Sequence, residues 1–99
     1  MGEVQLTFYC APADVDPLVD MLSSRSGAPV HVREELVRGR DYGDAFAAEQ
    51  VIGRLQRVAI DIVVPAGEAD VLVDAVRDVR RSRPVRWQTT PILARGRVE

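Results

Sequence analysis

Hydrophobic residues in this chain recur with a period of two, then 3.6, then two again, and this order limits the fold more than any other feature. Residues 4–10 alternate between apolar and polar side chains, which predicts a strand with one buried face. Val15, Leu18, Val19 and Leu22 follow at the spacing of an amphipathic helix. The chain therefore begins with a strand followed by a helix.

The same two periods return in the rest of the chain. They predict strands at 30–37, 55–64 and 85–93 and a second helix at 68–81. Residues 38–54 form a connection that is long for a hairpin and is therefore expected to be functional. Within it, residues 45–52 are rich in helix formers, so a short helix fits there.

The resulting βαββαβ order predicts an α+β, ferredoxin-like sandwich with two helices on one face of a four-stranded antiparallel sheet. We expect one domain over residues 1–99. Pro91 removes a hydrogen-bond donor from the last strand, which places that strand at a sheet edge or bends it there. The face toward the helices should carry Val4, Leu6, Phe8, Val30, Val32, Val58, Ile60, Ile62, Val64, Val85 and Trp87.

The opposite face of the sheet is half apolar, which favours burial against another subunit over full solvation. It should carry Gln5, Thr7, Tyr9, His31, Arg33, Ala59, Asp61, Val63, Arg86, Gln88 and Thr90. A hairpin centred near Phe46 would set His31 opposite Asp61 on this face.

Composition excludes several classes of protein. The formal net charge of −2 argues against non-specific nucleic-acid binding, which needs an excess of cationic side chains. No apolar run approaches the roughly 20 residues that cross a bilayer, so direct membrane insertion is not expected. The single cysteine, Cys10, excludes an internal disulfide framework and is typical of a cytoplasmic protein.

No catalytic constellation is visible, and we assign neither catalytic residues nor metal ligands. Cys10 and His31, the only cysteine and histidine, fall on opposite faces of the predicted sheet, which argues against a Cys-His dyad. Around an oligomer axis, His31 and Asp61 have the donor types that a divalent metal prefers, although pairing of the two side chains with each other is the simpler interpretation.

Arginine placement suggests an anion site. All 13 basic residues are arginine, and Arg38 and Arg40 flank Gly39 just as Arg95 and Arg97 flank Gly96. Guanidinium groups beside glycine amides can hold a phosphate or a carboxylate. The alternative is that these arginines pair with the many aspartates and glutamates of the chain.

Three segments carry a family resemblance. Residues 57–79 read RVAIDIVVPAGEADVLVDAVRDV, residues 37–43 read VRGRDYG, and residues 89–99 read TTPILARGRVE. They resemble, in turn, the third strand and second helix, the start of the T-loop, and the last strand of the PII (GlnB-like) signalling proteins. The stretch AAEQVIGRLQRV and Trp87 are similar to a PII-like subfamily often encoded beside heavy-metal efflux pumps.

The resemblance implies a homotrimer whose sheet faces pack toward the centre and whose subunit clefts bind adenine nucleotides. Gly39, Arg40 and Gly43 match the start of the T-loop, and Arg95 and Arg97 match the arginines that contact phosphate. The resemblance thus implies a non-enzymatic, cytoplasmic regulator that controls a membrane transporter or efflux pump through the 38–54 loop.

The sequence departs from the PII pattern between the second helix and the last strand. PII proteins carry a glycine-rich phosphate loop there, whereas this chain has only Ser82-Arg83-Pro84. The ligand class therefore stays open between an adenine nucleotide, another small anion, a divalent metal and no ligand at all. Two other functions remain: a CutA-like metal-binding trimer that uses His31, and a small ferredoxin-like enzyme subunit that holds its substrate with Arg38, Arg40 and Arg97.

Overall fold

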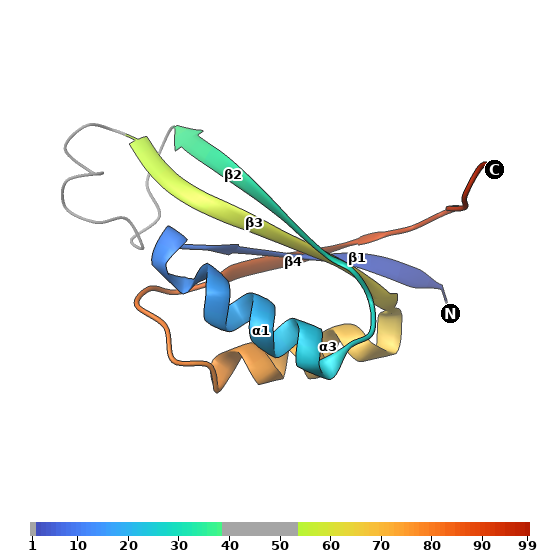
Figure 1. The fold of residues 1–99 in the computed structure, drawn as a ribbon, viewed down its shortest axis with the longest axis horizontal. Coiled ribbons are helices and arrows are strands. Elements are labelled where there is room, and N and C mark those ends of the chain that lie inside the picture. The colour runs from blue at the N-terminus through green and yellow to red at the C-terminus, as the bar shows by residue number, and fades with distance from the viewer. Residues whose placement is uncertain (1, 39–53) are drawn as a thin grey trace.

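The computed structural model describes residues 2–38 and 54–99, which form one antiparallel sheet with helices on one of its faces (Figure 1). The elements are β1 (Glu3–Cys10), the short 3-10 helix η1 (Pro12–Asp14), α1 (Val15–Arg25), β2 (Val30–Arg38), β3 (Arg54–Pro65), α3 (Ala66–Arg77) and β4 (Arg86–Pro91). The strand order is β2-β3-β1-β4, and every neighbouring pair is antiparallel. The ferredoxin-like α+β fold predicted from the hydrophobic periods is confirmed.

The core lies between the two central strands and the helix pair. β3 is a central strand, and residues on both of its faces are buried: Val58, Ile60, Ile62 and Val64 point to the helices, and Ala59 on the other face is fully buried. α1 and α3 lie side by side beneath the sheet (Figure 1). The buried cluster consists of Leu6, Phe8, Cys10, Leu18, Leu22, Val58, Ile60, Ile62, Val64, Ala69, Leu72, Val73 and Val76.

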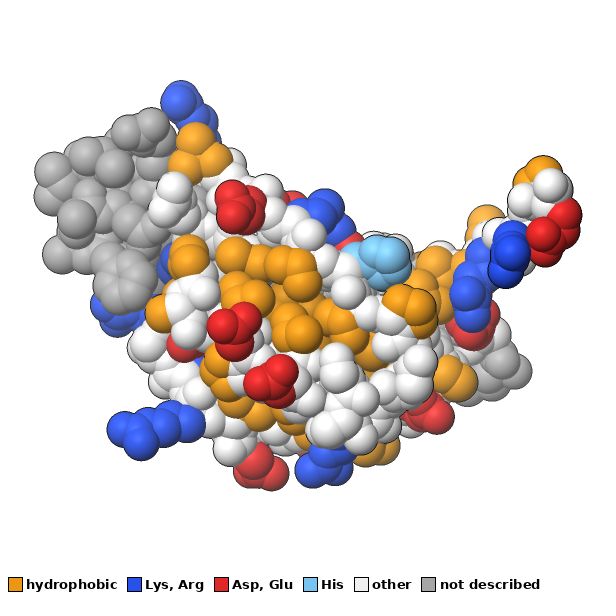
Figure 2. Space-filling view, viewed as in Figure 1, with side chains coloured by type: hydrophobic (Ala, Val, Ile, Leu, Met, Phe, Trp, Pro, Cys, Tyr) orange, Lys and Arg blue, Asp and Glu red, His pale blue; other side chains and the backbone are white. Residues whose placement is uncertain are grey.

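Two residues expected in this core are half exposed. Val32 on β2 is 49% exposed and Trp87 on β4 is 48% exposed, although both have the helix-facing parity. Both belong to outer strands, and α3 packs mainly on β1 and β3, so the helices do not fully cover the sheet edges. Hydrophobic side chains consequently gather on the surface between α1 and β2 (Figure 2). Leu36 on β2 is half exposed as well.

α3 ends at Arg77, four residues before the end that the periodicity predicts. The guanidinium of Arg81 turns back and donates to the carbonyl oxygens of Val76, Arg77 and Val79 at 3.1–3.3 Å. These acceptors lie at the C-terminal end of α3, where helix carbonyls lack partners four residues further on, and the Val76 carbonyl also accepts the Val79 amide at 3.1 Å. Arg81 therefore caps the end of the helix instead of continuing it.

Asp14 stands at the N-cap position of α1, but its carboxylate makes no capping hydrogen bond there and bonds elsewhere. It accepts hydrogen bonds from the Ser82 amide at 2.8 Å, the Ser82 hydroxyl at 3.1 Å and the Arg83 amide at 3.2 Å. The carboxylate, which is only 3% exposed, thus ties the start of α1 to the connection between α3 and β4.

The connection at 38–54 is described only at its ends, Arg38 and Arg54, which face each other across the β2–β3 ladder. The short helix expected at 45–52 lies outside the described residues. In the part of the chain that is described, no helix is long and apolar enough to cross a bilayer.

Candidate ligand-binding site

The predicted anion site has two parts, and the structure describes one of them. Gly39, Arg40 and Gly43 lie outside the described residues, directly after Arg38. Arg38 is the last residue of the β2–β3 ladder and is exposed. Arg38 itself lies at the end of the sheet at which β2 and β3 extend beyond β1.

Arg95 and Arg97 lie at the other end of the sheet. β4 ends where Pro91 pairs with Val4, and the chain then continues past the start of β1 as an extended tail (Figure 1). Val4 also pairs with Val64, ten residues along β3 from Arg54. At a rise of about 3.3 Å per residue, that separation is about 33 Å. A single chain thus keeps Arg38 far from the tail arginines.

The guanidinium of Arg95 is held by Glu3 within the same chain. Its Nε and Nη2 atoms donate to the two carboxylate oxygens of Glu3, each at 2.8 Å. This hydrogen bonding lowers the pKa of the Glu3 carboxyl from its ordinary value, so the pair persists at neutral pH and is lost as acid protonates Glu3. An anion that uses Arg95 must compete with Glu3, whereas Arg97 forms an ion pair with the exposed Glu99 at 3.2 Å.

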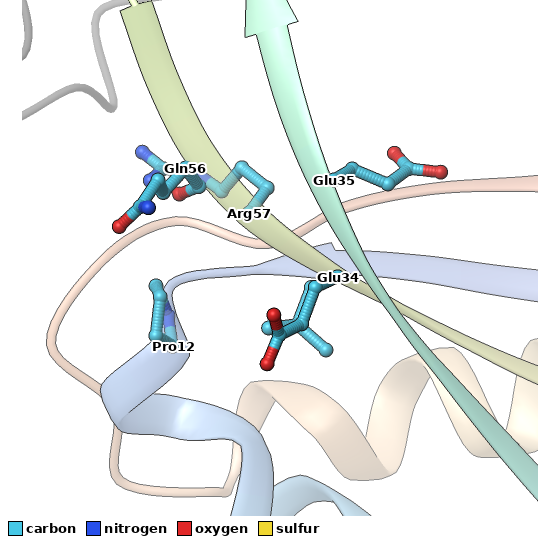
Figure 3. Close-up of a pocket in the computed structure, with 6 residues that line it drawn as sticks. Pro12, Glu34, Glu35, Gln56 and Arg57 are labelled. Atoms are coloured by element: carbon cyan, nitrogen blue, oxygen red, sulfur yellow. The ribbon is translucent and has the colours of Figure 1, made fainter.

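A pocket of about 200 Å³ lies where β2 and β3 extend past β1 (Figure 3). It is lined by Pro12, Glu34, Glu35, Gln56, Arg57 and Val58. Glu34 and Glu35 point to opposite sides of β2, and Arg57, 3% exposed, donates to the Gln56 carbonyl at 2.6 Å. Because carboxylates and a guanidinium share its wall, this pocket is not the purely cationic cradle that the arginine spacing predicted.

Asp61 organises the sheet face that the helices leave open. The predicted register is confirmed, since His31 is the cross-strand partner of Asp61, but the ion pair forms with Arg33 instead. Thr7 donates its hydroxyl to the same carboxylate at 2.6 Å. The long arginine side chain reaches diagonally along the strand pair. Its guanidinium offers two N–H donors to a carboxylate, which suits Asp61 better than the imidazole of His31 does.

The residues at the middle of this open face are buried even in a single chain. Thr7, Ala59 and Asp61 are 3%, 0% and 8% exposed, although within residues 2–38 and 54–99 no helix packs on this side. Ala59 lies between Tyr9 and Arg33, whose larger side chains account for its burial. The centre of this face therefore carries small side chains and no net charge, whereas charged side chains lie toward its rim.

Among the described residues, the side chains that could act as a nucleophile or hold a metal ion do not form a site. Burial raises the pKa of the Cys10 thiol to about 11, so this sulfur is protonated at neutral pH. Among residues 2–38 and 54–99, no three side chains of His, Cys, Asp or Glu come close enough to hold one metal ion.

Sequence reasoning missed the partners of three residues: Glu3 for Arg95, Arg33 for Asp61, and Ser82 for Asp14. Arg33 could have been found, because it is a diagonal neighbour of Asp61 in the predicted register. The other two pairs are separated by 92 and 68 residues, and only the tertiary fold brings them together.

One family model matches residues 1–99, and it is described as DUF3240, a protein family of unknown function. The chain belongs to the DUF3240 family. A crystal structure of a DUF3240 family protein from Shewanella baltica OS155 has a TM-score of 0.78 and 19% identity, covering 100% of this chain and 99% of the other. The DUF3240 fold is therefore shared over the full length.

The same fold extends beyond the DUF3240 family. The crystal structure of a protein described as PII-like signalling, from Thermus thermophilus, has a TM-score of 0.54 and 13% identity, covering 93% of each chain. The likeness to a PII-like fold is thus confirmed. No sequence among the curated proteins matches this DUF3240 chain.

Proposed function

We propose that this DUF3240 chain is a non-enzymatic, PII-like regulatory protein that acts as a homotrimer in the cytoplasm. The subunits pack with their open sheet faces together, and the clefts between them bind an adenine nucleotide or another small anion. Residues 38–54 then contact the regulated partner, a membrane transporter or metal-efflux system, in a way that depends on cleft occupancy.

The observation that carries this proposal is the separation of the two arginine groups. Arg38 and the tail arginines lie at opposite ends of the sheet, about 33 Å apart at the usual rise of a strand. Residues that bind one small anion must come within a few ångströms of it. A site that uses both groups therefore needs a second copy of the chain, whose tail approaches the Arg38 end of its neighbour.

The open face of the sheet supports contact between copies. Ala59 at its centre is fully buried, and the partly exposed Val63 adds apolar surface without a bulky side chain. Paired charges such as Arg33 with Asp61 need no partner from outside to be neutralised. A flat surface with small residues at its centre and satisfied polar groups can be covered by its own copies with little loss of hydrogen bonding.

A large charged side chain on this face is expected to dissociate the trimer. Val63→Arg would place a guanidinium among the facing sheets and would convert trimer to monomer in native mass spectrometry at micromolar concentration. Ala13→Arg is the matched control, because Ala13 is exposed on η1. His31→Glu tests the same face at an exposed position if Val63→Arg does not fold, and a wild-type chain that is monomeric contradicts the trimer.

Adenine nucleotides are expected to stabilise the protein through the composite cleft. At a hundred times the dissociation constant a ligand adds about 2.7 kcal/mol to the free energy of unfolding, which a thermal-shift titration detects. Arg40→Ala and Arg97→Ala should abolish the shift, whereas the exposed Arg25 on α1 serves as control in Arg25→Ala. Glu3→Gln should strengthen binding, because it weakens the pairing that holds Arg95.

Three results of that titration separate the alternatives. Stabilisation by zinc or copper and not by nucleotide indicates a metal-binding trimer instead. A nucleotide shift that survives both Arg40→Ala and Arg97→Ala rules out the composite arginine site. A trimer that responds to no ligand leaves regulation by partner contact alone.

A further inference from the structure

A small groove with an apolar floor separates α3 from the outer strand β4. Its volume is about 150 Å³, which suits one aliphatic side chain, and it is lined by Phe8, Val73, Val76, Arg77, Arg81, Val85 and Trp87. Phe8, Val73 and Val76 are buried and form the floor, whereas the indole of Trp87 is half exposed and forms one wall. An exposed tryptophan beside an apolar floor is typical of a docking surface.

The rim of this groove is strongly cationic. Residues 77–86, which run from the end of α3 to the start of β4, contain five arginines and one aspartate, whereas the whole chain has a formal net charge of −2. Arg77 and Arg81 line the groove itself, and the side chain of Arg77 is 73% exposed. This concentration of positive charge complements an acidic partner.

The neighbouring backbone can also take part. β4 is an outer strand, and among the described residues no strand pairs with its far edge. An extended segment could pair with that edge over Arg86–Thr90, and its side chains toward the helix layer would then lie against Trp87. Apolar floor, cationic rim and strand edge thus meet at one place.

We infer that the groove between α3 and β4 docks an extended acidic segment of a partner protein, with one apolar side chain inserted beside Trp87. An inorganic anion could bind the arginines but would leave the apolar floor uncovered. A neutral apolar segment would fill the floor but would gain nothing from the rim. Only a segment that is both acidic and carries an apolar side chain contacts the whole surface. This inference does not depend on the proposed trimer.

Trp87 is the only tryptophan in the chain, so its fluorescence reports the groove directly. The wild-type protein is titrated with a synthetic peptide that carries one leucine between runs of glutamate. We expect a blue shift of the emission on binding, and weaker binding at high salt. Lysine in place of glutamate, or serine in place of leucine, should abolish the shift.

Arg77→Glu tests the rim without disturbing the fold, because Arg77 is exposed and the Asp74 with which it forms an ion pair is exposed too. This variant should bind the acidic peptide at least about fivefold more weakly. Arg25→Glu makes the same change of charge at an exposed position of α1, and this variant should bind like the wild type. Circular dichroism of both variants establishes that the fold is retained.

Four outcomes overturn the inference. The peptide produces no change in Trp87 emission, or both arginine variants bind it equally well. Polyphosphate produces the same shift at the same concentration, which makes the groove a plain anion site. The emission shifts with protein concentration alone and the peptide does not compete, which assigns the groove to a second copy of this chain.

Discussion

Replacing Phe8 with alanine is expected to lower the free energy of unfolding by about 3–5 kcal/mol, the range for a fully buried aromatic side chain. Phe8 is the largest fully buried side chain in the core and lies on the central strand β1 between Ile60 and Trp87. Its removal leaves a cavity that rigid neighbours on β3 and α3 cannot fill, and it deepens the groove beside Trp87. Urea denaturation followed by circular dichroism measures the change.

The appropriate control is Val71→Ala on α3, where the side chain is 57% exposed. It should change the free energy of unfolding by no more than about 0.5 kcal/mol. All variants are compared at one protein concentration, because association would add to the apparent stability. A loss below about 1 kcal/mol for Phe8→Ala would contradict the packing of β1 against α3.

Replacing Asp14 with alanine is expected to cost about 2–4 kcal/mol, because it leaves the Ser82 and Arg83 amides without their buried acceptor. The effect should be local as well as global. Hydrogen exchange at these two amides should accelerate, since the link between α1 and the α3–β4 connection is gone. Ser82→Ala removes only the 3.1 Å hydroxyl contact and should lose about 1 kcal/mol.

Asp16→Ala is the matched control, because Asp16 is an exposed aspartate in the first turn of α1. The same exchange experiment separates two roles for Asp14. If Asp14 acted as a helix cap, Asp14→Ala would accelerate exchange in the first turn of α1 and leave Ser82 unchanged. That result would contradict the tertiary role of the carboxylate.

Phe8 and Asp14 both support the groove between α3 and β4 that we propose as a docking surface. Phe8 supports the floor of the groove beside Trp87, and Asp14 anchors the arginine-rich connection that forms its rim. A destabilised but folded Asp14→Ala protein should therefore bind the acidic peptide more weakly than the Ser82→Ala protein does. Stability and docking are coupled here through the same few contacts.

Much of the fold could be predicted because its signals are local. Alternation placed the central strand β3, helical spacing placed α1, and Pro91 correctly indicated that β4 is an outer strand. Even the register of His31 with Asp61 was predictable, because a one-residue slip would have moved every side chain of β2 to the other face. Each of these inferences depends on residues that are close in sequence or on strict periodicity.

The candidate site was much less predictable, because its contacts join distant parts of the chain. The spacing of arginines around Gly39 and Gly96 indicated an anion, yet Arg95 is held by Glu3 and shares no site with Arg38 in one chain. The pocket beside Arg57 also contains two glutamates that no motif marked.

The order of hydrophobic periods alone specified which segments are strands, which are helices and which face of each turns inward. Only the folded chain decided how far each face is covered. Trp87 and Val32 have the parity of core residues, but they stand on outer strands that the two helices do not fully cover. The hydrophobic period of a segment determines the side to which each side chain points. The exposure of that side chain depends on which other segments pack against it, and long-range packing decides this.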